Sequence, residues 1–153
     1  MHSRIYQVNT KPIESYEYID KSDYYDHWFT NQIADYVNGD TDREDDIEWL
    51  KSCAKGYDVD KDENGYYLIV HSKEEYFTDA FRKFKEALAK IGEPTIEDFI
   101  KGIDLWYLND ADEDKYGFYV EWYGHELMPL DRFIRRCVVD QKYYLGGTID
   151  YHY

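Results

Sequence analysis

The dipeptide Asn64-Gly65 constrains the fold of this chain more than any other feature of its sequence. It separates residues 57–63 from residues 66–71, and both runs contain the Tyr and Val residues that are enriched in strands. Asn-Gly between two such runs favours a two-residue turn with positive φ at both positions, which joins antiparallel strands. The sequence therefore predicts a β-hairpin, and with it a sheet that is mainly antiparallel.

Residues 73–91 carry the clearest helical pattern. Ser72 and Glu75 have the spacing of a capping box, and Gly92 and Pro94 are typical of a helix end. Apolar residues recur at helical spacing between these signals: Phe77, Ala80, Phe81, Phe84, Leu88 and Ile91. We expect this helix to pack on the core through four buried side chains, Phe77, Phe81, Phe84 and Leu88.

The other elements follow from the same kinds of pattern. Strands are expected at 3–9, at 103–108 and 116–123 around an acidic turn at 110–114, and at 148–152 after Gly146-Gly147. Helices are expected at 23–37 after the N-cap Ser22, from the capping box Thr41/Glu44 to Gly56, from Thr95 to Ile100, and from Pro129 with Leu130, Phe133, Ile134, Cys137 and Val138 facing inward. The order is then β-α-α-β-β-α-α-β-β-α-β. We expect one α+β domain over residues 1–153, with about five helices packed on a small, mainly antiparallel sheet.

The charge of the chain excludes several classes of protein. Thirty-three acidic residues stand against 18 Lys and Arg, a net charge of −15. Binding to nucleic-acid phosphates through overall charge requires the opposite sign, and anionic lipid is disfavoured for the same reason. Apolar runs such as residues 66–70 are far shorter than the ~20 residues that cross a bilayer. Cys53 and Cys137 fall on separate expected helices, which favours reduced thiols and a cytoplasmic location.

The acidic residues are concentrated in one third of the chain. Residues 14–48 hold 12 of them against only Lys21 and Arg43, a net charge of −10. Like charges one helical turn apart cost roughly 0.2–0.5 kcal/mol per pair, so stability alone does not favour this arrangement. Tyr and Trp, which are frequent at interfaces, are interleaved with the acids. The residues expected to contact a partner are Glu17, Asp20, Asp23, Tyr24, Tyr25, Asp26, Asp40, Asp42, Asp45, Asp46 and Glu48.

Carboxylates alternating with planar rings resemble the spaced anions and stackable bases of a nucleic acid. The leading hypothesis is an acidic inhibitor that occupies the basic groove of a nuclease or another nucleic-acid-binding protein, without binding nucleic acid itself. In size and charge the chain is similar to DNA-mimicking anti-CRISPR and anti-restriction proteins of phages and plasmids, and to immunity proteins against nuclease toxins. The alternative without a partner is an acidic, solvated surface over an aromatic core. The oligomeric state stays open.

Other residues of the sequence are compatible with two other functions. His27 or His125, with nearby acids in a Tyr-lined pocket, would suit an enzyme or a small-ligand binder. Residues 60–65 match the first half of an EF-hand loop, with Asp60, Asp62 and Asn64 at ligand positions, but His71 stands where a bidentate Glu is required. Residues 125–129 begin like a zinc-protease motif that Pro129 interrupts. We expect no catalytic residues, metal or cofactor.

Overall fold

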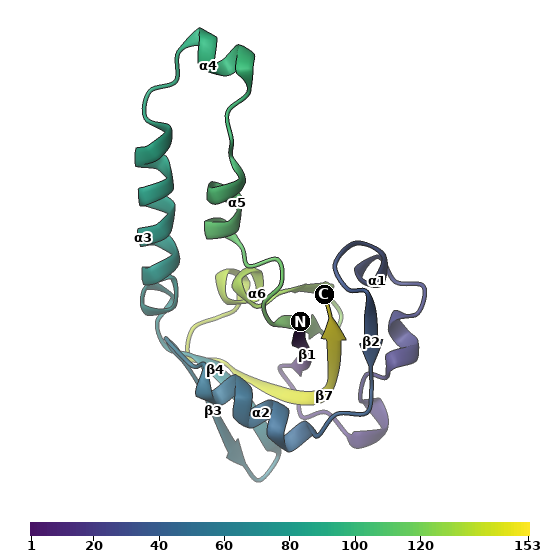
Figure 1. The fold of residues 1–153 in the computed structure, drawn as a ribbon. Coiled ribbons are helices and arrows are strands. Elements are labelled where there is room, and N and C mark those ends of the chain that lie inside the picture. Colours follow the sequence, from purple (N-terminus) through teal and green to yellow (C-terminus); the bar gives the residue numbers. More distant parts are fainter.

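A computed structural model describes residues 1–153 and contains one seven-stranded sheet (Figure 1). The strands follow the order β3-β4-β7-β1-β5-β6, and β2 pairs with β7. Their bounds are β1 His2–Asn9, β2 Tyr36–Asn38, β3 Tyr57–Asp62, β4 Gly65–Val70, β5 Tyr119–Trp122, β6 Leu127–Pro129 and β7 Lys142–His152. Only β1 and β5 run parallel. The expected α+β class and mainly antiparallel sheet are confirmed.

The chain also forms six α-helices and two 3-10 helices, whereas about five helices were expected. Their bounds are η1 Ser15–Glu17, η2 Lys21–Tyr24, α1 Trp28–Gln32, α2 Arg43–Ser52, α3 Lys73–Ile91, α4 Ile96–Lys101, α5 Trp106–Asp112 and α6 Leu130–Arg136. The strongest sequence signals are confirmed. β3 and β4 form the predicted hairpin, but its two turn residues are Glu63 and Asn64, because Gly65 pairs with Asp62, and of the predicted dipeptide only Gly65 has a positive φ. Helix α3 spans the residues predicted, with Ser72 as its N-cap.

A β-bulge lies at the centre of the sheet. Along β1, Tyr6 pairs with Thr148 and Val8 with Leu145, so Gly146 and Gly147 together face Gln7. A Cβ atom on Gly146 would come within 2.3 Å of the Gln7 side-chain oxygen, which explains why glycine stands there. Residues 148–152 are strand as predicted, but the strand begins earlier, at Lys142, and runs through both glycines.

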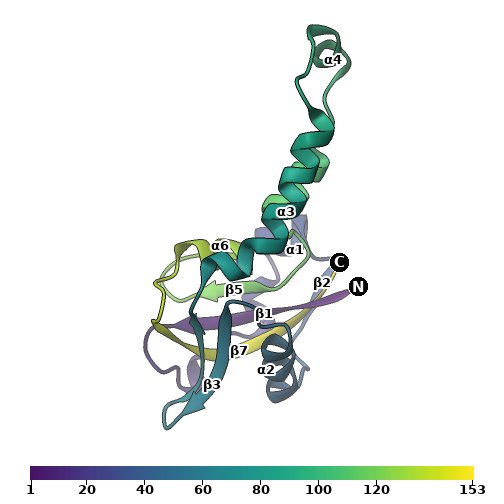
Figure 2. The same cartoon turned by 90° about the vertical axis from the view of Figure 1, so that its left-hand side faces the viewer.

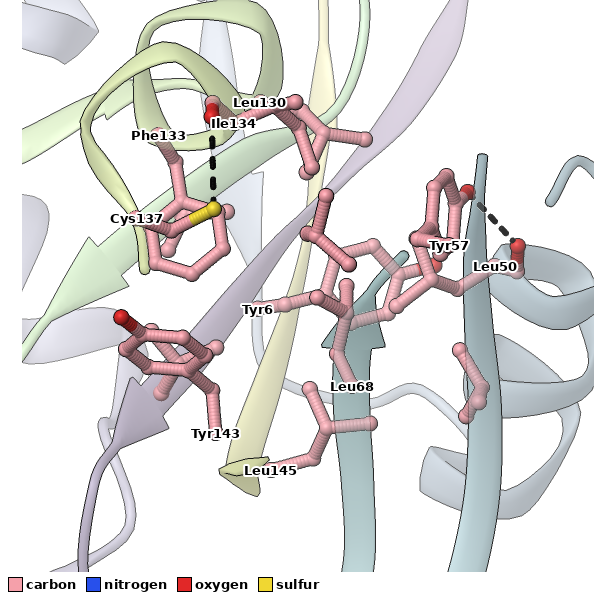
Figure 3. Close-up of a cluster of buried hydrophobic side chains, with 14 of the residues drawn as sticks. Tyr6, Leu50, Tyr57, Leu68, Leu130, Phe133, Ile134, Cys137, Tyr143 and Leu145 are labelled. Carbon is pink, nitrogen blue, oxygen red and sulfur yellow. Dashed lines mark hydrogen bonds between the residues drawn. The ribbon is translucent and has the colours of Figure 1, made fainter. Parts of the chain in front are cut away.

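The bulge lets β7 serve two hydrophobic cores. Tyr143 and Leu145 belong to the larger core, whereas Ile149 and Tyr151 belong to the smaller one, although all four numbers are odd. One extra residue in the strand reverses which side chains point to which face. Figure 3 shows part of the larger core, where residues of α2 and α6 meet Tyr6, Leu68 and the aromatic ring of Tyr143.

The helix predicted over 23–37 is wrong. Asp20 and not Ser22 caps a short 3-10 helix, His27 caps α1 by accepting a hydrogen bond from the N–H of Phe29, and residues 36–38 pair with β7 as a strand. Successive capping side chains stop one helix and start the next, which interrupts a continuous helix. The free edge of β7 supplies the strand pairing that no local pattern indicates.

Three further predictions near the C-terminus need correction. The strand predicted at 103–108 is replaced by α5, and the acidic turn at 110–114 begins as the end of that helix. The strand predicted at 116–123 shortens to β5, and β6 ends at Pro129 as an edge strand that the sequence did not indicate. Within α6 and its end, Leu130, Phe133, Ile134 and Cys137 are buried as expected, but Val138 is 63% exposed.

Helices α3, α4 and α5 form an arm that projects from the sheet (Figures 1 and 2). At its base Arg132 pairs with Glu113 at 2.7 Å, and Arg135 pairs with Asp112 at 3.0 Å, which ties the arm to α6. Phe77 and Phe84 are partly buried, but Phe81 is 59% and Leu88 46% exposed. The expected burial of these two is wrong because α3 extends beyond the sheet that would cover them.

Two phenylalanines allow the boundary between core and arm to be measured. Phe133 is completely buried in the larger core, so Phe133→Ala should lower the free energy of unfolding by about 3–5 kcal/mol. The exposed Phe81 on the arm serves as the matched control, and Phe81→Ala should change the free energy of unfolding of the single chain, measured in dilute solution, by less than about 1 kcal/mol. Urea unfolding followed by circular dichroism measures both. Equal losses would contradict this placement of the core.

Candidate partner-binding face

Gln7 holds the acidic segment against the sheet. Its side-chain amide donates to the carbonyl of Glu17 at 2.9 Å, and its side-chain oxygen accepts from the N–H of Ile19 at 3.2 Å and from that of Gly147 at 2.9 Å. Gln7 is only 4% exposed, so these bonds form away from bulk water. The segment that carries the first acids is thereby fixed to the bulge between β1 and β7.

Acids recur at every third position from Glu14 to Asp26, and this spacing has a structural cause. Glu14 and Glu17 form the capping box of η1, and Asp20 and Asp23 form that of η2. The N–H of Ser22 donates to Asp20 and holds the pKa of that carboxyl below its usual range. The spacing therefore reflects two short helical turns in succession and not one face of a long helix.

The fold brings the two acidic clusters of the sequence together. Lys21, next to Asp20, packs its side chain against Gly39, next to Asp40. The guanidinium of Arg43 lies 5.0 Å from the ring of Tyr18 and donates to the carbonyls of Leu145 and Gly146 at 2.8 and 2.6 Å. The two basic residues of the segment thus join its halves, and most of the donors of Arg43 are directed into the protein.

Most of the acidic charge stays exposed and uncompensated. Eleven of the 12 acids of residues 14–48 are exposed. Four have an ion-pair partner: Asp35, Glu44, Asp46 and Glu48. The other eight have none, and they define what we call the acidic face: Glu14, Glu17, Asp20, Asp23, Asp26, Asp40, Asp42 and Asp45. The aromatic side chains exposed in the same segment are Tyr16, Tyr25, Trp28 and Tyr36.

Two residues expected at the interface are instead structural. Tyr24 is 2% exposed in the smaller core, where its hydroxyl lies 3.4 Å from Glu121 and burial raises the pKa of the phenol. Asp46 is 3% exposed and accepts hydrogen bonds from Arg4, Thr41 and Thr148. Both predictions are wrong because alternation along the chain cannot separate an acid or a Tyr that faces the sheet from one that faces water. Glu48 is exposed but pairs with Lys51 at 3.6 Å.

The histidines considered for catalysis lie in different settings. His27 lines a cleft of about 360 Å³ with Tyr24 and Glu121, and burial lowers the pKa of its imidazole. Its Nδ1 atom accepts from the N–H of Phe29 at 3.2 Å, so one ring nitrogen is used as a helix cap. His125 stacks on Trp122 with 4.1 Å between ring centroids and is exposed. His125 does not line the cleft of His27, although the two residues before it, Tyr123 and Gly124, do.

A second cleft, of about 350 Å³, was not indicated by the sequence. Its aromatic wall includes Trp49, Tyr57 and Tyr76, and Asp114 and Asp131 lie at its side. Burial raises the pKa of the Asp114 carboxyl, and the nearby charge of Asp131 acts in the same direction. These residues come from distant parts of the chain, so no local spacing could have revealed the cleft.

The hairpin residues considered for calcium make the contacts of a turn. Asp62 accepts from the N–H of Asn64 at 2.8 Å, and its carboxylate is held by Lys142 at 2.7 Å and by the hydroxyl of Tyr144 at 3.1 Å. No three His, Cys, Asp or Glu side chains come together as they would around a metal ion. None of the helices is both long and apolar enough to cross a membrane.

Comparisons with protein-family models, with curated proteins and with solved structures found no match to this chain. The geometry of its own residues is therefore the only basis for a function.

Neighbouring aspartates separate structural from surface acids. Asp46→Asn removes one of the two buried carboxylates that pair with Arg4, the other being Asp150, and disturbs the bonds from Thr41 and Thr148, so it should lower the free energy of unfolding by about 1–3 kcal/mol. Asp45→Asn, one position earlier on the acidic face, should change it by less than about 1 kcal/mol, because the loss of a negative charge in the first turn of α2 opposes the relief of like-charge repulsion. Thermal unfolding at neutral pH compares the two. A large loss for both variants would mean that Asp45 also has a structural role.

Glu121 gives a prediction about pH. Burial raises the pKa of this carboxyl. Above that pKa the buried carboxyl is charged and lowers the stability of the fold, whereas below it the carboxyl is protonated and does not. Glu121→Gln should therefore raise the melting temperature at pH 7, while still offering an oxygen to Tyr24. The gain should shrink as the pH falls through the raised pKa toward the unfolded value of about 4.3. An equal gain at pH 4 and pH 7 would contradict this assignment.

Proposed function

We propose that the acidic face binds the basic, nucleic-acid-binding surface of a partner protein, such as a nuclease, and blocks it. The observation that carries the proposal is the set of eight exposed carboxylates without an ion-pair partner on one segment of the chain. A groove of Arg and Lys side chains that normally holds phosphates would supply the missing cations. The role is that of an inhibitor, in the manner of anti-CRISPR, anti-restriction or toxin-immunity proteins.

The geometry supports this role in two ways. Capping boxes and the Gln7 contacts hold the first acids in fixed positions, so little conformational entropy is lost when a partner binds. Exposed rings such as Tyr25 and Trp28 lie among the acids and can fill spaces that bases would occupy. Opposite charge also accelerates the encounter between the two proteins.

The best test uses acids whose carboxylates make no hydrogen bond within the protein. Asp26, Asp40 and Asp45 meet this condition, whereas Asp20, Asp23 and Asp42 cap helices, so their reversal would also disturb the fold. The triple variant Asp26→Lys, Asp40→Lys, Asp45→Lys should lose its partner while its melting temperature changes little, since only Asp45 lies in the first turn of a helix. The control variant reverses three acids outside the face that also lack such contacts: Glu63, Glu74 and Asp110.

The partner itself is found by affinity capture from a lysate of the source organism at low and high salt, with mass spectrometry of the captured proteins. Binding should weaken steeply with salt, because the Debye length falls from about 10 Å at 0.1 M to about 3 Å at 1 M. DNA or RNA should compete for the captured partner. A partner that binds equally well in high salt, or that tolerates the triple variant but not the control, would refute the proposal.

A second candidate, a small-ligand-binding protein, is favoured by the aromatic cleft beside Asp114. Rings from three aromatic side chains and a carboxyl with a raised pKa suit a planar, cationic ligand. The acidic-face variants separate the two functions, because none of the substituted residues lines this cleft.

A further inference from the structure

The arm exposes apolar side chains that nothing in the chain covers. Every residue from 92 to 102 is exposed, including the three apolar residues of α4. A helical hairpin needs a further layer to bury residues on its outer sides. The large side chains left in solvent include Phe81, Leu88, Ile96, Phe99, Ile100 and Trp106, with exposures between 46% and 77%. Together they offer on the order of 600–800 Å² per molecule, close to the ~800 Å² that one partner contributes to a standard interface.

Grooves between α3 and α5 provide places for side chains of another molecule. One groove, of about 320 Å³, is lined by Ala80, Phe81 and Phe84 near the base of the arm. Another, of about 380 Å³, is lined by Ala87, Ile91 and Tyr107 near its tip. Two such hairpins packed together would form a four-helix bundle, in which the side chains of one pair fill the spaces of the other.

The charge of the arm identifies the molecule that fits it. The outer part of the arm, residues 81–108, carries five acids and five bases, so it is neutral in a chain of net charge −15. The charges are also separated along its length. Residues 82–90, which we call the stem, have a net charge of +3, and residues 93–104, which we call the tip, have a net charge of −3. In an antiparallel pair of identical arms each stem lies against the partner's tip, and two-fold symmetry makes these two contacts equivalent.

We propose that the arm is a dimerisation element, and that two copies of this chain pair their arms antiparallel through Phe81, Phe99 and their apolar neighbours. The pairing buries apolar surface that is otherwise exposed and matches the positive stem with the negative tip. It is independent of the acidic face, which lies on other elements of the chain.

Sedimentation equilibrium over a dilution series tests the pairing. The native chain should be a dimer at the higher concentrations, and the variant Phe99→Ser, Ile100→Ser should be monomeric throughout. These two residues are 72% and 77% exposed, so the variant should keep the native circular dichroism spectrum. A native chain that is monomeric at every concentration overturns the proposal, and co-sedimentation of that monomer with phosphatidylcholine vesicles would assign the arm to a lipid surface instead. A variant that stays dimeric also overturns it.

Charge exchange tests the antiparallel order. Glu93→Lys with Glu97→Lys should weaken the dimer at least tenfold, because the tip then repels the partner's stem. Adding Lys83→Glu and Lys85→Glu should restore it, since the exchange re-creates the match with opposite signs. Asp98 is left intact because its carboxylate caps α4. If the quadruple variant keeps its helical content but does not recover the native dimer affinity, the antiparallel order is refuted.

Discussion

The contact between Gln7 and the two glycines of β7 is the constraint on which both the sheet and the acidic face depend. The bulge at Gly146-Gly147 makes room for the Gln7 side chain, and a Cβ atom on Gly146 would close that space. The bulge also turns Tyr143 and Ile149 to different cores. One buried amide group therefore links the pairing of β1 with β7, the division of the hydrophobic residues and the position of the segment that follows residue 14.

Local structure explains how so many acids are tolerated in one segment. Asp20 and Asp42 each accept backbone N–H groups at a helix start, a contact worth about 1 kcal/mol. This gain offsets much of the repulsion between neighbouring carboxylates, which is roughly 0.2–0.5 kcal/mol per pair. Asp26 and Asp40 make no such contact through their side chains and lie outside the first turn of a helix, so folding gives no reason for their charge. The functional argument rests on acids of this kind more than on the total charge.

The sequence predicted the parts of the fold that depend on short-range chemistry. The hairpin at Asn64-Gly65 and the helix capped by Ser72 are set by turn and capping residues within a few positions, and both are confirmed. Burial of Phe81, Tyr24 and Asp46 depends on what lies opposite them in space, and all three were predicted wrongly. Asp26 and Tyr25 were predicted to contact a partner, and both are exposed, as such a contact requires. The spacing of Glu14, Glu17, Asp20 and Asp23 alone could not show that these acids form capping boxes. A capping box and a helical face share the same three-residue interval.

The distribution of charge also explains why an arm is needed for two such molecules to associate. The residues outside 81–108 carry the whole net charge of −15, so close contact between two bodies is opposed by strong repulsion. A helix of 19 residues, the length of α3, spans about 28 Å, whereas the Debye length at physiological ionic strength is only about 8 Å. Antiparallel arms would therefore hold the two acidic bodies several screening lengths apart. Apolar contact could then act at the arms without cancelling the electrostatic field that each acidic face presents to its own partner.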